Sequence, residues 1–186
     1  MSPAVPLSFD PIERAAELWG GRIGDPTAMA AVTNVMRVQQ ILQREVDAAL
    51  ARHGITFARY EALVLLSFAR TGRLAMSVMG RRLQLHPTSV TNIVDRLEGD
   101  KLVRRVPDAG DRRTTLVELT AAGHDVLAAA TTTVIGIRFG LAGLTPAQAR
   151  TLTDLLTKVR RAAGDFRQAP THDHHHPEAR RNVARC

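Results

Sequence analysis

The stretch Leu83-Gln-Leu-His-Pro-Thr-Ser-Val-Thr-Asn-Ile-Val-Asp-Arg-Leu-Glu98 decides the fold of this chain. Its Leu-His-Pro triplet predicts a turn, because Pro87 suits the first position of a new helix. After the proline, apolar residues recur at helical spacing, which predicts a helix that buries one face. That face comprises Val90, Ile93, Val94 and Leu97. The stretch therefore predicts a turn and an amphipathic helix with short polar side chains on its other faces.

The segments on either side of this stretch complete a recognisable unit. A short helical pattern covers residues 77–84, so two helices are expected around the turn. Two strand-like runs follow at 102–106 and 114–119, and residues 107–113 between them are rich in turn-forming types. Two helices and a hairpin with a basic tip are typical of a winged helix-turn-helix. The sequence thus predicts a mainly α fold with a small β-hairpin.

The polar side chains of the second helix suit the edges of DNA bases and phosphate groups. Asn92 is the best single residue for base reading, since its amide can pair with adenine through two hydrogen bonds. Arg96 either reaches a phosphate, interacts with the helix dipole or pairs with an acid of the hairpin. Arg112 and Arg113 at the tip suit a narrow minor groove, and Asp111 is expected to orient an arginine or close the turn. The predicted DNA-binding residues are Thr88, Ser89, Thr91, Asn92, Arg96, Arg112 and Arg113.

The remainder of the chain is predicted to be helical, with loose ends. Residues 1–25 form an arm with a short helix, and a long amphipathic helix covers 26–54. Residues 55–120 contain the winged helix-turn-helix, 121–163 two further helices, and 164–186 a disordered tail. In the first of those two helices apolar residues step by three and four, which predicts a helix–helix interface. That seam is Leu127, Ala130, Val134, Ile137 and Leu141, and the buried face of the last helix is Leu152, Leu155, Leu156 and Val159. Helix starts are predicted at Asp25-Pro26, at a Thr56 cap and at a capping box of Thr145 and Gln148.

These motifs together strongly resemble the MarR family of bacterial transcriptional regulators. The resemblance rests on residues 83–98, on Leu-Val-Arg-Arg at 102–105 and on Asp-Arg-Arg-Thr-Thr-Leu-Val-Glu-Leu-Thr at 111–120, and it covers about residues 28–163. By this match Asp111 and Arg113 form the Asp-x-Arg pair of the wing. Members often carry glycine just before the first wing strand, where this chain has Lys101, with Gly99 two residues earlier.

The resemblance implies a ligand-responsive regulator that acts as a homodimer on a pseudo-palindromic operator, most often as a repressor. The helices of 26–54 and 121–163 would be its dimerisation helices, with Leu127, Val134, Leu141 and Leu152 at the interface. It also implies a small aromatic or phenolic effector. Trp19, His53 and Glu61 could contribute to its pocket, although each has a plainer interpretation: Trp19 packs the arm, His53 ends a helix, and Glu61 is solvated.

Composition and charge narrow the classes of function. Of the net charge of +7, residues 70–113 carry +5, with ten basic and five acidic side chains, so the excess lies on the predicted DNA-binding unit. There is one cysteine, Cys186, and no apolar run long enough for a membrane helix, so we expect a cytoplasmic protein without a disulfide framework, zinc module or cofactor. The histidines of 172–176 could chelate a metal but are expected to be a passive tail.

Two other classes of protein could share some of these features. An enzyme could use His124, Asp125 or Glu61 as acid–base groups, but the sequence contains no nucleophile–base motif, phosphate-binding glycine loop or metal-ligand spacing. A sequence-independent architectural DNA-binding protein would also be basic. Such proteins rely on wedges and phosphate contacts rather than on polar groups along a recognition helix.

Overall fold

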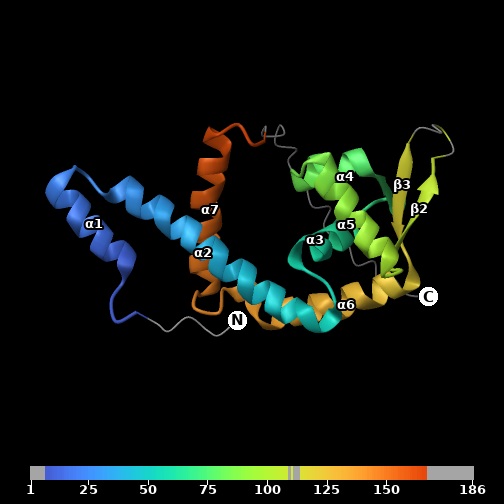
Figure 1. Cartoon of the computed structure of the whole chain (residues 1–186), viewed down its shortest axis with the longest axis horizontal. Helices are drawn as coiled ribbons and strands as arrows, with labels where there is room; N and C mark the ends of the chain where they lie inside the picture. The colour runs from blue at the N-terminus through green and yellow to red at the C-terminus, as the bar shows by residue number, and fades with distance from the viewer. Residues whose placement is uncertain (1–6, 109, 111–113, 167–186) are drawn as a thin grey trace, which may run out of the picture. The chain divides into compact units, whose positions relative to one another are not determined.

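A computed structural model describes residues 7–108, 110 and 114–166 (Figure 1). The chain divides into two compact units, residues 1–142 and 143–186, and each is considered by itself. The predicted wing-tip residues Asp111, Arg112 and Arg113, the histidines of 172–176 and Cys186 lie outside the described residues.

Two helices begin the first unit. Helix α1 (Pro11–Arg22) starts after Asp10, whose carboxylate accepts hydrogen bonds from the backbone N–H groups of Ile12 and Glu13. Helix α2 (Thr27–Leu50) follows, and α1 packs against it. Pro26 occupies the N-cap position, so the helix starts one residue later than predicted; Asp25 accepts from the backbone N–H of Thr27 (3.0 Å) and from its hydroxyl (2.7 Å).

Helix α2 ends earlier than the sequence predicts. A short 3₁₀ helix, η1 (Ala51–His53), separates it from Gly54, which adopts a left-handed conformation with φ of 71°. Helix α3 (Phe57–Ser67) then begins after Thr56. The Thr56 side chain makes no capping hydrogen bond, contrary to prediction, because Asp47 on α2 accepts the Phe57 N–H instead at 2.6 Å.

The winged helix-turn-helix is present as predicted, with one additional strand. After α3 come β1 (Arg73–Ala75), α4 (Met76–Leu83), α5 (Pro87–Gly99), β2 (Val103–Pro107) and β3 (Thr115–Leu119). The sheet is antiparallel in the order β1-β3-β2, so β3 is its central strand (Figure 1). The sequence predicted only β2 and β3, because three residues are too few to show the alternation of a strand.

One hydrophobic core joins this module to the long helices of the first unit. The fully buried side chains come from α2, α3, α4, α5, β2, β3 and α6, and α3 lies at the centre with four buried residues. The largest are Leu50, Leu63, Leu66, Met79, Leu97, Val90, Val94, Val103, Val117 and Val134. The apolar face predicted for α5 is thus confirmed at Val90, Val94 and Leu97, while Ile93 is half-buried.

Helix α6 (Ala121–Gly136) differs from the predicted seam in two ways. It ends before Leu141, because Arg138 and Phe139 both take left-handed conformations and a short 3₁₀ helix, η2 (Arg138–Gly140), follows. Moreover, Leu127 and Val134 are buried in the core of their own chain, 8% and 0% exposed. Leu127 and Val134 therefore pack within their own chain, contrary to the predicted dimer interface, whereas the places of the half-buried Leu141 and Leu152 at an interface stay predictions.

The second unit contains helix α7 (Pro146–Ala162). The predicted capping box is confirmed: the Gln148 N–H donates to the Thr145 hydroxyl at 3.3 Å, and the Thr145 N–H donates to Gln148 Oε1 at 2.8 Å. Leu152 is half-buried, whereas the other three residues of the predicted buried face are exposed. These are Leu155, Leu156 and Val159. No helix in the described part of the chain is long and apolar enough to cross a membrane.

Candidate nucleic-acid interface

Helix α5 presents a polar face to solvent, directly opposite its buried residues. His86 Nδ1 accepts from the Thr88 N–H at 3.3 Å and caps the helix, and Pro87 occupies its first position. Thr88, Ser89, Thr91, Asn92 and Arg96 are all exposed, as predicted. The Thr91 hydroxyl donates to the Pro87 carbonyl at 3.1 Å, so its donor is already used within the helix. The groups with a free donor for a base edge are therefore Thr88, Ser89 and Asn92.

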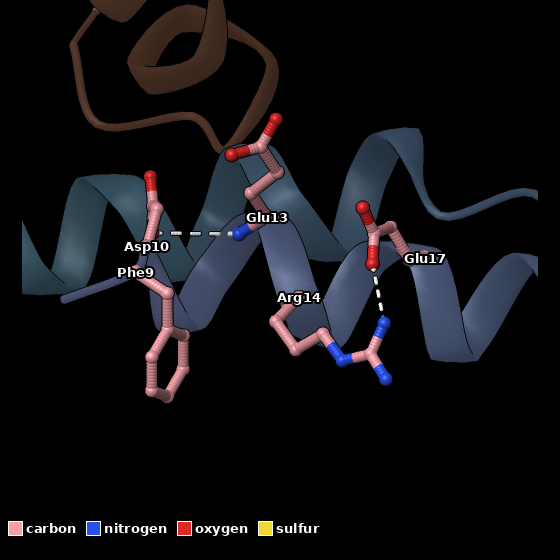
Figure 2. A pocket seen from close by; sticks show the side chains of 5 residues that line it. All are labelled: Phe9, Asp10, Glu13, Arg14 and Glu17. Carbon is pink, nitrogen blue, oxygen red and sulfur yellow. Dashed lines mark hydrogen bonds and ion pairs between the residues drawn. The ribbon is translucent and has the colours of Figure 1, made fainter.

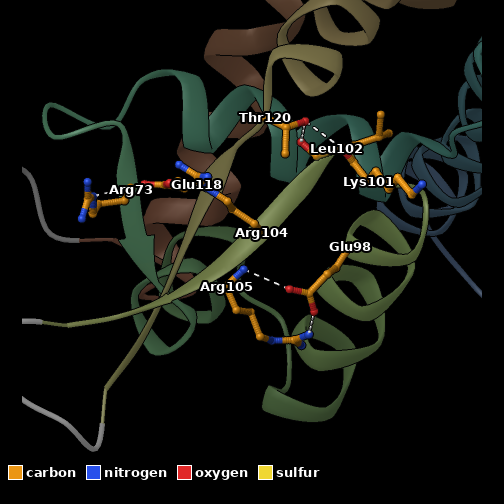
Figure 3. A network of polar contacts seen from close by, with 8 residues as sticks. All are labelled: Arg73, Glu98, Lys101, Leu102, Arg104, Arg105, Glu118 and Thr120. Atoms are coloured by element: carbon orange, nitrogen blue, oxygen red, sulfur yellow. Dashed lines mark hydrogen bonds and ion pairs between the residues drawn. The ribbon is translucent and has the colours of Figure 1, made fainter.

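An arginine of the first wing strand holds α5 in place. The Arg105 guanidinium forms an ion pair with Asp95 at 2.5 Å. It also pairs with Glu98, and the Arg105 N–H donates to Glu98 Oε1 at 3.0 Å (Figure 3). Burial by itself lowers the pKa of this guanidinium, but its hydrogen bonds and attraction to Asp95 and Glu98 raise the pKa above its usual value. These contacts fix the angle between the helix and the wing.

The turn between α5 and β2 forms with a lysine, Lys101, at the position where the family pattern often has glycine. The Leu102 N–H donates to the Leu97 carbonyl at 2.8 Å, and the Lys101 N–H donates to the Glu98 carbonyl at 2.9 Å. This pair of bonds defines a Schellman motif, in which the left-handed position usually holds glycine. Here Lys101 occupies it with φ of 59°. The turn is retained although its usual residue is absent.

One glutamate of the sheet pairs with two further arginines of residues 70–113. Glu118 on β3, mostly buried, pairs with Arg104 on β2 at 2.6 Å and with Arg73 on β1 at 3.3 Å (Figure 3). The three residues occupy matching positions in the register of the sheet. Arg73, Arg104 and Arg105 thus serve the structure of the wing. The sequence does not predict these roles, because pairs between a helix and a strand, or across strands, leave no fixed spacing in the sequence.

The three residues suggested for an effector pocket lie on three different elements, and their part in a pocket stays a prediction. Trp19 is 36% exposed on α1, and Glu61 lies on the exposed side of α3, where partial burial raises the pKa of its carboxyl. His53 is in η1, where its Nε2 lies 2.8 Å from the Thr133 hydroxyl; Arg52 donates to the same oxygen at 2.5 Å. The plainer interpretations of His53 and Glu61, a helix end and a solvated side, agree with these positions.

A hollow on the N-terminal arm has polar residues that are already engaged with one another. It is lined by Phe9, Asp10, Glu13, Arg14 and Glu17 (Figure 2). Asp10 caps α1, and Arg14 Nη1 pairs with Glu17 Oε2 at 2.7 Å on the exposed side of the helix. This surface arrangement is accounted for by the start of α1 and by one exposed ion pair.

The two residues named for an enzymatic alternative, His124 and Asp125, are both exposed in the first turns of α6. Among the described residues, no group of three or more His, Cys, Asp or Glu is arranged to hold a metal ion.

Comparisons with known proteins agree on one family. A model of the MarR family matches residues 53–114. The repressor MdtR from Bacillus subtilis is 33% identical over 84 residues, which are 45% of this chain and 53% of MdtR. The matches span roughly half to two thirds of the length of the curated relatives.

Solved structures extend the likeness to the flanking helices. Sco5413, a MarR family transcriptional regulator from Streptomyces coelicolor, is 47% identical with a TM-score of 0.71, and the match covers 76% of this chain and 99% of that one. Sco3205 from the same organism, solved in complex with DNA, shares the fold at 23% identity, with a TM-score of 0.67 over 78% of this chain and 93% of that one. The chain belongs to the MarR family of transcriptional regulators.

Proposed function

We propose that this protein is a sequence-specific DNA-binding repressor that acts as a homodimer in the cytoplasm. The observation that carries the proposal is the exposed polar face of α5, which offers Thr88, Ser89, Asn92 and Arg96 on the side opposite Val90, Val94 and Leu97. A helix of this kind enters the major groove, where base edges are read. The repressor role is supported by the name of the relative MdtR.

Selection of bound sequences from a random duplex pool tests the proposal and gives the operator. The selected duplex should bind at least about a thousandfold more tightly than a scrambled duplex at the same salt concentration. Asn92→Ala should cost about 1–3 kcal/mol on the selected duplex and little on the scrambled one. Thr132→Ala on α6 is a control away from this helix, because the Thr132 hydroxyl donates to the Ala128 carbonyl of its own helix. Equal binding of both duplexes by the parent chain would instead support the architectural alternative.

A homodimer is supported by apolar side chains that the first unit leaves exposed on α2. Val32, Val35 and Met36 are 57%, 48% and 62% exposed. On α7, three apolar side chains are also exposed, as described above. Exposed apolar groups at helical spacing are typical of a helix surface that binds another subunit. These residues replace Leu127 and Val134 as the proposed interface.

Val35→Asp and Met36→Asp test the dimer by light scattering during size-exclusion chromatography. Both variants should have the mass of one chain, whereas Asn34→Asp, on the opposite face of the same helix, should retain the mass of two. A parent chain with the mass of a monomer, or variants that remain dimeric, would contradict this assignment. Leu127→Asp is unsuited to the purpose, since it would place a charge in the core of the monomer.

We further propose that a small aromatic or phenolic compound regulates DNA binding. This proposal is supported only by membership of the MarR family, and we assign no residues to the binding of the compound. Such an effector acts only if it prefers the form of the dimer that does not bind DNA, because equal affinity for both forms shifts nothing. Benzoate and phenol are suitable first probes: they should raise the melting temperature and release the selected duplex. A rise in melting temperature without release would exclude regulation by that compound.

A further inference from the structure

A hollow beside the polar face of α5 is lined by residues from two helices. Thr56 and Arg59 line it from the start of α3, and Asn92, Ile93 and Arg96 line it from α5. Its polar side chains are two guanidinium groups, an amide and a hydroxyl, all of which can donate hydrogen bonds. A lining of donors without a carboxylate is suited to an oxyanion.

The Thr56 hydroxyl has no other use in this structure. Thr56 stands at the N-cap position of α3, where a hydroxyl normally accepts a backbone N–H. Asp47 takes that role by accepting the Phe57 N–H at 2.6 Å. Thr56 makes no side-chain hydrogen bond to any residue in the described part of the chain. Its hydroxyl is therefore available to a ligand in the hollow.

The two arginines of the hollow differ in their exposure and in their ion pairing. Arg96 is exposed, and its guanidinium forms no ion pair with a described residue. The Arg59 side chain is only 16% exposed, and its Nη1 donates to Oδ2 of Asp100 at 2.9 Å. Asp100 follows the last residue of α5 and is 51% exposed. One cation is thus free, while the other is neutralised by a carboxylate that water can reach.

The hollow also lies on a definite side of α5. Asp95 and Glu98 face the wing, where they bind Arg105, whereas Ile93 and Arg96 face α3. Asn92 lies between these two sides, on the face that points away from the core. When Asn92 reads a base in the major groove, the backbone of a flanking DNA strand runs along the α3 side.

We propose that Arg59, Arg96 and Thr56 bind one phosphate of the DNA backbone in this hollow, and that Asp100 competes with that phosphate for Arg59. The inference rests on the proposed function, and it adds a contact that is independent of base sequence. Guanidinium groups bind phosphate through paired, charge-assisted hydrogen bonds, which is why arginine suits the site. Asp100 lowers the affinity for every duplex equally, since it holds Arg59 and repels the phosphate.

Fluorescence anisotropy of the full chain, with the selected and the scrambled duplex at about 50 to 200 mM salt, tests the site. Arg96→Ala should weaken binding to both duplexes by the same factor, and should reduce the salt slope by about 0.9 for the lost phosphate contact. Asp100→Asn should tighten binding to both duplexes by up to about fivefold, the range of one surface ion pair. Unequal effects on the two duplexes would overturn the proposal in favour of base reading.

A double-mutant cycle separates competition for Arg59 from a general effect of charge. In an Arg59→Gln background, Asp100→Asn should no longer tighten binding; if the gain persists, the competition is refuted. Arg14→Gln on α1 removes a cation elsewhere and should leave affinity and salt slope unchanged. Thermal unfolding confirms that each variant is folded. If the parent chain binds no duplex, the proposed function itself fails; if it binds and Arg96→Ala leaves the slope unchanged, only the phosphate site fails.

Discussion

Gly123, in the first turn of α6, is packed too closely against the chain leading into β2 to accept a side chain. A Cβ at this position would lie 2.0 Å from the carbonyl oxygen of Leu102 and 3.2 Å from Cδ2 of Leu119. Since real Cβ contacts essentially never fall below 3.0 Å, Gly123→Ala must push α6 away from Leu102 by about 1 Å. The atom it meets is backbone, so no side-chain rotation can relieve the contact.

The same displacement disturbs the cap of α6. The Thr120 hydroxyl donates to the Lys101 carbonyl at 2.7 Å and accepts from the Gly123 N–H at 3.0 Å, while the Thr120 N–H donates to the Leu102 carbonyl at 3.1 Å. Overpacking costs about 1–3 kcal/mol and a weakened cap about 1 kcal/mol, whereas alanine gains about 1 kcal/mol over glycine inside a helix. The net loss of unfolding free energy should be about 1–3 kcal/mol, or roughly 2–10 °C in melting temperature.

Urea unfolding followed by circular dichroism measures this loss, and Gly136→Ala is its matched control. Gly136 is also in α6, but a Cβ there would meet nothing within 4 Å. The control should therefore equal the parent or exceed it by up to about 1 kcal/mol. If Gly123→Ala is as stable as the control, α6 does not approach Leu102 as closely as described, and the reasoning fails.

Three further substitutions probe single features of the first unit. Lys101→Gly should raise the unfolding free energy by up to about 1 kcal/mol, because glycine adopts the left-handed conformation of this position without strain. Lys101→Ala should give no gain, and equal unfolding free energies of the two variants in urea would show that the backbone at Lys101 is not strained. Hydrogen bonds from Thr27 lower the pKa of Asp25 below its unfolded value of 3.8. The ionised carboxylate therefore stabilises the fold at pH values above 3.8, and this stabilisation is lost as the pH falls through the lower pKa of the folded chain. The melting-temperature deficit of Asp25→Ala should therefore shrink in acid, and a constant deficit would contradict this. Arg105→Met should cost about 1–2 kcal/mol in urea unfolding and weaken operator binding, because its two acidic partners on α5 lose their cation; unchanged binding would show that they do not orient the helix.

The winged helix-turn-helix could be predicted from the sequence because the patterns that indicate it lie within short stretches of the chain. Pro87 after a turn, an apolar face at helical spacing and two short strands each reflect the conformation of a few neighbouring residues. The capping box at Thr145 is local in the same sense, and it is present in the structure. Lys101 shows the limit of such signals, because the Schellman turn forms there without the glycine that would have marked it.

The apolar seam of α6 could not show whether it packs against a second subunit, because periodicity indicates that a face is buried and not what buries it. Leu127 and Val134 have the spacing of an interface, yet they pack within their own chain, where α6 contacts α2 and α3. The sequence also does not predict where α6 ends, because Arg138 and Phe139 adopt left-handed conformations that neither residue type favours. Gly136 is the last residue of α6 and Gly140 follows the two left-handed residues, so neither glycine marks them.

The described basic residues of 70–113 fall into two groups: those that form ion pairs within the winged helix-turn-helix and those that form none with a described residue. Arg73, Arg104 and Arg105 pair with carboxylates, so neutralising one of them should disturb the wing before it affects phosphate binding. Five others in the described part of residues 70–113 are exposed and form no ion pair with a described residue: Arg70, Arg81, Arg82, Arg96 and Lys101. Only unpaired cations release counterions without first breaking an internal bond, so the salt dependence of binding should follow this second group rather than the net charge.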